Sequence, residues 1–238
     1  MLLRSLIRFD SLINILLPRA CLLCRSITSE QHHLCPPCAR ELPILSHSCV
    51  KCAQILYSGH ELICGDCLNH PPPYTRVFAL YSYEPPLPSL IAGLKFEAEF
   101  SHASLFSTMM THAIQSRWYP EQNLPDCIIP MPLHPFRLRE RGYNQAAEIA
   151  KPVARSLKIP LNHGLIRIKP TLPQSSLTAS ERRKNTSRAF SSLQSYEGMH
   201  IALVDDVMTT GSTVRSAAAV IKTHGASRID VWCCARRG

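Results

Sequence analysis

Glycine is scarce in this sequence, with nine glycines against nineteen prolines in 238 residues. Most connections between elements are therefore expected to be stiff. The chain also lacks a long apolar run at its start, because Arg8 and Asp10 interrupt the apolar segment 1–17. No small-residue cleavage site follows before Cys21. Neither a transmembrane helix nor a secretory signal peptide is expected.

The apolar residues of segment 1–17 fit one face of an amphipathic helix. They are Leu2, Leu3, Leu6, Ile7, Ile13, Leu16 and Leu17. We expect this helix to dock onto protein, and contact with a membrane surface is the alternative.

Acidic residues are fewer than basic ones, and the formal net charge is +9. The imbalance is strongest between residues 137 and 188, where twelve Lys or Arg stand against three acids. A basic chain favours anionic partners such as nucleic acid and phosphorylated substrates. Charge alone does not distinguish between them.

Cysteine is concentrated in segment 18–75, where four Cys-x-x-Cys pairs form two sets of similar spacing. The eight residues are Cys21, Cys24, Cys35, Cys38, Cys49, Cys52, Cys64 and Cys67. Two such pairs close a tetrahedral zinc site and leave no position for water. The spacing therefore predicts a double zinc ribbon with two structural Zn²⁺.

Alternatives stay open for this module. A disulfide framework would require an oxidising compartment. One degenerate site or interleaved ligands would change the pairing of the cysteines. The module is expected to be either a docking surface for nucleic acid or protein, or a structural cap.

The stretch 201–213 has the order strand, acidic pair, small-residue turn, helix. Residues 201–204 are apolar without interruption, which is typical of a strand buried on both faces of a parallel sheet. Asp205 and Asp206 follow at its carboxyl end, where ligands bind in open α/β sheets. The turn lacks the lysine of a P-loop, so a Walker site is disfavoured.

The turn itself is rich in hydroxyls and contains one glycine. Its residues are Thr209, Thr210, Gly211, Ser212 and Thr213. A turn that opens a helix offers free backbone N–H groups and the positive end of the helix dipole, which suit a phosphate. Two carboxylates beside a phosphate site suit ribose hydroxyls, or a divalent cation held with them.

The segment 76–238 reads as one α/β domain. Strands are expected at 76–83, 126–130, 201–204 and 228–234, and helices at 87–96, 103–118 and 146–157. The proline-rich stretch 131–135 predicts a rigid loop at a strand's carboxyl end.

Several polar residues of this domain could meet phosphate or pyrophosphate. They are Lys95, His134, Arg137, Arg139, Arg141, Asn144 and Gln145. The alternatives are an exposed lysine at a helix C-terminus and a solvated basic face. The polar segment 173–185, with Gln174 and Arg182, is a candidate lid or a surface loop without function.

Residues 204–213, Val-Asp-Asp-Val-Met-Thr-Thr-Gly-Ser-Thr, resemble the phosphoribosyl pyrophosphate motif of type I phosphoribosyltransferases. The resemblance implies that Asp205 and Asp206 contact the ribose hydroxyls and that the turn 209–213 surrounds the 5′-phosphate. It also implies Mg²⁺ with the pyrophosphate. The expected fold is α/β, type I phosphoribosyltransferase-like and Rossmann-like, with a parallel sheet and helices on both faces.

Motifs over essentially the whole chain occur in an order that resembles the ComF/GntX family of competence proteins. They are the double cysteine module, the Pro-x-Pro-Leu-His-Pro loop at 130–135, Arg-Glu-Arg-Gly-Tyr-Asn-Gln at 139–145, the pattern Gln174-x2-Leu177-x4-Arg182-x2-Asn185-x4-Phe190, and the acidic motif at 205–206. The resemblance implies a cytoplasmic protein at the inner face of the membrane that handles incoming single-stranded DNA.

Two alternative functions stay open. The first is an active phosphoribosyltransferase of nucleotide metabolism, whose acceptor the sequence does not identify. The second is a non-catalytic adaptor that docks DNA-import or helicase proteins through its zinc module. No glutaminase domain is recognised, so ammonia transfer from glutamine is not expected.

Overall fold

The computed structural model describes residues 20–28, 33–57, 62–120, 123–169 and 189–238. The expected helix 1–17 and the candidate lid residues Gln174 and Arg182 lie outside the described residues. The chain divides into two compact units, 1–42 and 43–238. Within the described ranges, no helix is long and apolar enough to cross a membrane.

The first unit holds the first four cysteines. Its helix α2 (Pro36–Arg40) begins directly after Cys35 and has proline in its first turn, where a missing N–H costs no helical hydrogen bond. Ala20 and Ile27 form an antiparallel bridge, and the N–H of Cys21 donates to the carbonyl of Ser26 at 2.8 Å. These contacts fold the chain back on itself around the first Cys-x-x-Cys pair.

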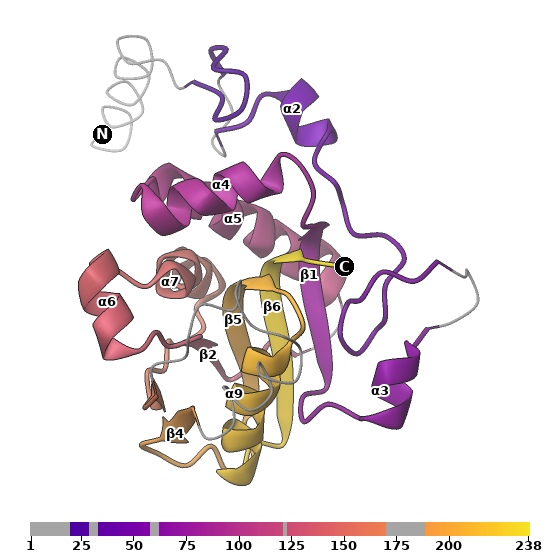
Figure 1. The fold of residues 1–238 in the computed structure, drawn as a ribbon, viewed down its shortest axis with the longest axis vertical. Coiled ribbons are helices and arrows are strands. Elements are labelled where there is room, and N and C mark those ends of the chain that lie inside the picture. The colour runs from indigo at the N-terminus through magenta and orange to yellow at the C-terminus, as the bar shows by residue number, and fades with distance from the viewer. Residues whose placement is uncertain (1–19, 29–32, 58–61, 121–122, 170–188) are drawn as a thin grey trace, which may run out of the picture. The chain divides into compact units, whose positions relative to one another are not determined.

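The second unit contains a parallel sheet of four strands in the order β1-β6-β5-β2 (Figure 1). The strands are β1 (Arg76–Ser82), β2 (Cys127–Pro130), β5 (His200–Met208) and β6 (Arg228–Arg236). The two central strands are buried over most of their length, as expected for apolar runs covered on both faces. Val204 pairs with Pro130 on one side and with Trp232 on the other.

Helices cover the sheet on both faces. α7 (Gln145–Leu157) packs on β2 and β5, α5 (Phe100–Ala113) packs on α7 and β1, and α4 (Leu87–Phe96) packs on α5. The π-helical turn η1 (Ile114–Trp118) continues α5. α9 (Ser212–Thr223) packs on β6 and lies in front of the sheet in Figure 1. The predicted α/β fold with a parallel sheet is confirmed.

Two features were not expected from the sequence. The arginine-rich stretch after the proline loop forms a helix, α6 (Pro135–Arg141), which ends at Gly142 in the left-handed conformation, with φ of 83°. Two short strands, β3 (Leu165–Arg167) and β4 (Phe190–Ser192), pair antiparallel outside the main sheet. β3 follows β2 as the next strand along the chain, but it pairs only with β4 and does not join the parallel sheet.

The second set of cysteines belongs to the second unit. Cys49, Cys52 and Cys67 lie in one buried cluster with apolar residues of α9 and β5. Cys67 itself belongs to the short helix α3 (Gly65–Asn69). The compact units thus divide between residues 42 and 43, within the predicted module 18–75. The predicted domain boundary between residues 75 and 76 stays a prediction.

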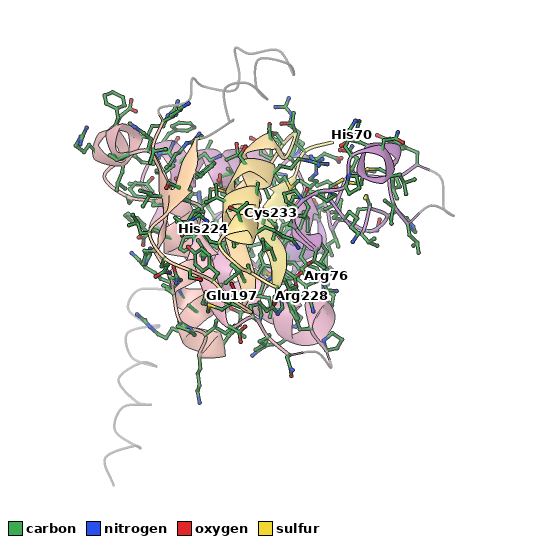
Figure 2. The ribbon with its side chains drawn as sticks, turned by 90° about the horizontal axis from the view of Figure 1, so that it is seen from below. His70, Arg76, Glu197, His224, Arg228 and Cys233 are labelled. Atoms are coloured by element: carbon green, nitrogen blue, oxygen red, sulfur yellow. The ribbon has the colours of Figure 1, made fainter. Side chains whose placement is uncertain are left out.

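A polar cluster fixes the amino ends of the strands. Asp230 is fully buried and accepts a hydrogen bond from Tyr119 at 2.6 Å. It also forms ion pairs with Arg228 at 2.9 Å, His200 at 3.0 Å and Arg76 at 3.6 Å. Figure 2 shows Arg76 and Arg228 near each other at this end of the sheet. The net effect lowers the pKa of Asp230: burial by itself would raise it, but the hydrogen bonds and the neighbouring cations outweigh burial.

Candidate functional site

The acidic pair lies in the carboxyl-terminal half of β5, which continues to Met208, whereas the predicted strand ended at Val204 before the two acids. Asp206 is buried, with 3% of its surface exposed, and Asp205 is partly buried. The two carboxyl groups lie close enough for each to affect the pKa of the other. The N–H of Asp206 donates to Oδ1 of Asp205 at 2.9 Å.

Asp206 connects to two of the predicted phosphate-site residues. Nζ of Lys95, at the end of α4, lies 2.5 Å from Oδ2 of Asp206. Nε2 of Gln145, in the first turn of α7, donates to Oδ1 of Asp206 at 3.4 Å, and the Gln145 side chain in turn accepts from Arg141. The fold thus links Lys95, Asp206 and the neighbouring pair Gln145 and Arg141, from three distant segments of the sequence, in one polar chain.

The two carboxylates differ in protonation behaviour. Burial raises the pKa of Asp205 well above its usual value, and the negative charge of Asp206 raises it further. Burial also raises the pKa of Asp206, but Lys95 outweighs this effect, so its pKa is lowered. Asp206 is therefore an ionised carboxylate paired with a cation. A ligand that donates hydrogen bonds to Asp205 or brings a cation would stabilise its ionised form.

The turn 209–213 has the geometry of an anion-binding helix start. Gly211 precedes α9 in the left-handed conformation, with φ of 75°. A Cβ at this position would stand 2.5 Å from Cε of Met208 and 3.9 Å from the hydroxyl of Tyr74. The hydroxyls of Thr210 and Ser212 lie 2.7 Å apart. The turn needs glycine for its backbone conformation, and a side chain here would also displace the end of the flexible Met208 side chain.

The proline-rich loop 131–135 runs beside β5, where the N–H of Met131 donates to the carbonyl of Val204 at 2.8 Å. Two predicted phosphate-site residues cap helices here. Nδ1 of His134 accepts from the N–H of Phe136 at 3.2 Å at the start of α6. Asn144 caps α7 through its Oδ1 and donates to the carbonyl of Met131 at 3.0 Å. Both side chains shape the loop, and their contact with a ligand stays a prediction.

Two of the three arginines of α6 border a small pocket of about 250 Å³. Its lining residues are Lys95, Phe96, Ala98, Arg137, Glu140, Arg141 and Tyr143. The guanidinium of Arg141 lies 5.6 Å from the centre of the Phe96 ring. Arg139 is exposed and does not line this pocket. The structure therefore brings Lys95, Arg137 and Arg141 together beside Asp206.

Sequence reasoning missed Arg236, which is 5% exposed and lies at the end of β6. Its Nε donates to the carbonyl of Cys52 at 2.9 Å, and its Nη1 donates to the carbonyls of Met208 and Thr209. Its Nη2 donates to Oε1 of Gln54 at 2.7 Å. Arg236 thus connects the loop of the second cysteine cluster to the residues that lead into the turn. Nothing in its sequence context signals this role.

The eight predicted zinc ligands form two groups of four. Cys21, Cys24, Cys35 and Cys38 form one group, and Cys49, Cys52, Cys64 and Cys67 form the other, with the sulfurs of each group within 4.8 Å of one another. Sγ–Sγ distances of 3.6 Å join Cys24 to Cys35 and Cys52 to Cys64. Tetrahedral zinc with bonds of about 2.3 Å requires sulfurs roughly 3.8 Å apart.

Backbone donors support the same assignment. The N–H of Cys64 points to Sγ of Cys49 at 3.3 Å. Burial raises the pKa of Cys49, but backbone N–H groups around its sulfur outweigh burial and lower it to about 7. Burial likewise raises the pKa of Cys21, but backbone N–H groups around its sulfur outweigh burial and lower it to about 6. Such donors stabilise thiolates, the form that binds metal. The residues present fit two structural zinc ions with closed coordination.

These features define the class of protein: a phosphoribosyltransferase-type α/β domain joined to a double zinc ribbon. Residues 12–68 match the family described as double zinc ribbon domain, and residues 144–238 match the phosphoribosyl transferase domain. Together with the relatives below, these matches place the chain in the ComF/GntX family.

Three relatives illustrate the similarity. DNA utilization protein YhgH of Salmonella typhi is 35% identical over 224 residues, covering 92% of this chain and 97% of the relative. Competence protein F of Haemophilus influenzae is 34% identical over 224 residues, covering 91% and 96%. Competence protein ComFC of Bacillus subtilis is 27% identical over 214 residues, covering 87% and 79%.

Proposed function

We propose that this chain binds a phosphoribosyl pyrophosphate-type ligand at the end of β5 and handles single-stranded DNA in natural competence. The acidic pair carries the first part of the proposal. Lys95 neutralises Asp206, whereas burial and Asp206 raise the pKa of Asp205. Ribose hydroxyls that donate to these carboxylates would relieve this imbalance.

The remaining groups suit the two phosphate ends of such a ligand. The turn 209–213 offers helix N–H groups to the 5′-phosphate. Lys95, Arg137 and Arg141 line one pocket, where they can meet pyrophosphate, and Lys95 pairs with Asp206. Mg²⁺ would be held largely through the pyrophosphate oxygens. The protein thereby orients the ribose between two anion sites.

The competence role is supported by the relatives, which are named competence proteins and DNA utilization proteins. It is also supported by a basic–aromatic surface, which we define by Phe96, Phe100, Phe136, Arg137, Arg139 and Arg141. Its three phenylalanines are 76%, 49% and 60% exposed, respectively. Exposed aromatic rings between cations suit single-stranded DNA, whose bases stack on the rings while the cations meet its phosphates. We expect the chain to bind single-stranded DNA on the cytoplasmic side of the membrane.

Calorimetric titration with phosphoribosyl pyrophosphate and Mg²⁺ tests the ligand site. We expect the zinc-loaded protein to bind and the Asp205→Asn/Asp206→Asn variant to lose affinity at least tenfold, about 1.4 kcal/mol. Release of pyrophosphate in the presence of a candidate acceptor would show that the chain also has transferase activity. Absence of binding by the unmodified protein would refute the ligand proposal.

Fluorescence anisotropy with labelled single-stranded DNA tests the second part. Replacing Phe96 and Phe136 by alanine should weaken binding by about 1–3 kcal/mol for each stacked base. Replacing Arg137 and Arg139 by glutamate should weaken it further and reduce its salt dependence. Leu193→Ala, at another exposed apolar side chain (71% exposed) on a different surface segment, is the matched control. Unchanged DNA binding at low salt would leave the adaptor function as the better explanation.

A further inference from the structure

A second cavity, of about 700 Å³, borders the start of the turn 209–213 and shares no lining residue with the pocket of Arg137 and Arg141. Cys52 and Cys64 contribute to its lining from the second cysteine cluster, and Thr209 and Thr210 contribute from the turn. Its other lining residues are Gln54, Asp66, Tyr74, Met208, Arg215, Arg236, Arg237 and Gly238. The cavity therefore joins the zinc-ribbon segment of the second unit to the proposed phosphate site.

Tyr74 is the unexplained group in this cavity. It is 3% exposed, and its hydroxyl has no hydrogen-bond partner among the described residues. Leaving a buried hydroxyl unpaired disfavours the folded state, so such groups are rare and call for an explanation. The same hydroxyl stands 3.9 Å from the position of a Cβ at Gly211, so it lies beside the turn.

The surroundings of Tyr74 favour an anionic partner. Burial raises the pKa of Tyr74, so its hydroxyl stays protonated and can donate. Arg215, in the first turn of α9, lines the same cavity, where its guanidinium donates to the carbonyl of His70 at 3.0 Å and to Asp66 at 3.2 Å. Asp66 is the one carboxylate side chain among the lining residues, and its side chain is 70% exposed.

We propose that the Tyr74 hydroxyl donates a hydrogen bond to the phosphate monoester bound at the turn 209–213. The zinc-ribbon segment that precedes β1 thereby supplies one wall of the ligand site, with Arg215 adding positive charge. The inference rests on the proposed function and deepens it. It assigns a binding residue outside the acidic motif and distinguishes the phosphate monoester end of the ligand from the pyrophosphate end.

Tyr74→Phe separates this role from a structural one. Removing an unpaired hydroxyl should leave the melting temperature of the free protein unchanged or raise it. The dissociation constant for ribose 5-phosphate should rise about tenfold or more, as expected for loss of a hydrogen bond to a charged group. The dissociation constant for pyrophosphate with Mg²⁺ should not change, because pyrophosphate lacks the ribose phosphate end.

Tyr196→Phe is the matched control. Tyr196 is another fully buried tyrosine, and its N–H donates to the carbonyl of His224 at the opposite end of α9. This variant should bind both probes as the unmodified protein does. Unchanged ribose 5-phosphate affinity in Tyr74→Phe, equal losses for both probes, or a lower melting temperature would each overturn the proposal. If the unmodified protein binds neither probe, the ligand site itself is refuted and the role of Tyr74 with it.

Discussion

Buried carboxylates occupy both ends of the same parallel sheet, but their surroundings differ. At the amino end, Asp230 is held by a tyrosine, a histidine and two arginines, and its pKa is lowered. At the carboxyl end, Lys95 pairs with Asp206, while the pKa of Asp205 is raised. A carboxylate with a full set of partners stabilises the fold. An acidic pair with too little positive charge is suited to a ligand that supplies the missing contacts.

The largest expected effect lies at the amino end. Replacing Asp230 by alanine should lower the free energy of unfolding by about 3–5 kcal/mol, because Arg228 and Arg76 would lose their buried counter-charge. Urea denaturation measures this change. The same substitution at Asp205 should cost less than about 1 kcal/mol, because it removes a carboxylate that burial disfavours. Equal losses at the two positions would contradict the comparison.

Zinc removal should affect the carboxyl end more than the amino end. Arg236 ties the carbonyl of Cys52 to the carbonyls of Met208 and Thr209, so loosening the second cysteine cluster should loosen the turn. After chelation, amide hydrogen exchange in residues 209–213 should accelerate at least tenfold, about 1.4 kcal/mol in opening free energy. Amides of residues 228–231 should change less. Uniform acceleration across the sheet would mean that zinc acts on the whole unit.

The pH dependence of stability should have opposite signs at the two ends. The native pKa of Asp205 is raised, so its ionisation opposes folding, and stability falls as pH rises above its unfolded value of about 3.9. Asp205→Asn should therefore stabilise the protein by about 1 kcal/mol at pH 7 and have little effect near pH 4.

Asp230 provides the opposite case. Its native pKa is lowered, so its contribution is present above the unfolded value and is lost as pH falls through the native value. Thermal denaturation of Asp230→Asn and Asp205→Asn at several pH values from about 4 to 7 measures both pH dependences. A stabilising effect of Asp205→Asn that is independent of pH would contradict the assignment.

The smallest effect is expected at Arg139, which is exposed on α6 and outside the pocket of Arg137 and Arg141. Arg139→Gln should change stability by less than about 0.5 kcal/mol. It should leave phosphoribosyl pyrophosphate binding unchanged and lower the salt slope of DNA binding by about one. A large loss of ligand affinity would extend the ligand site to the outer face of this helix.

Local patterns in the sequence predicted the parts of the molecule that depend on neighbouring residues. The apolar run 201–204, the acids that follow it and the glycine of the turn identified a strand, a carboxyl end and a helix start. The Cys-x-x-Cys spacing predicted two groups of four sulfurs, and the structure confirms them. Helix α6 was missed because the prolines at 130, 132 and 135 indicated a loop, whereas Pro135 in fact begins the helix.

The sequence by itself determined the α/β class, the acidic motif and the metal ligands, because each depends on a spacing of a few residues. Only the tertiary structure decided that Lys95 reaches Asp206 and that the second cysteine cluster packs in the core of the α/β unit. Only the tertiary structure placed Tyr74 and Arg236 beside the turn. The contacts of Lys95 with Asp206 and of Arg236 with Cys52 join residues more than a hundred positions apart. A local pattern in the sequence does not show which strand ends meet when parallel strands assemble.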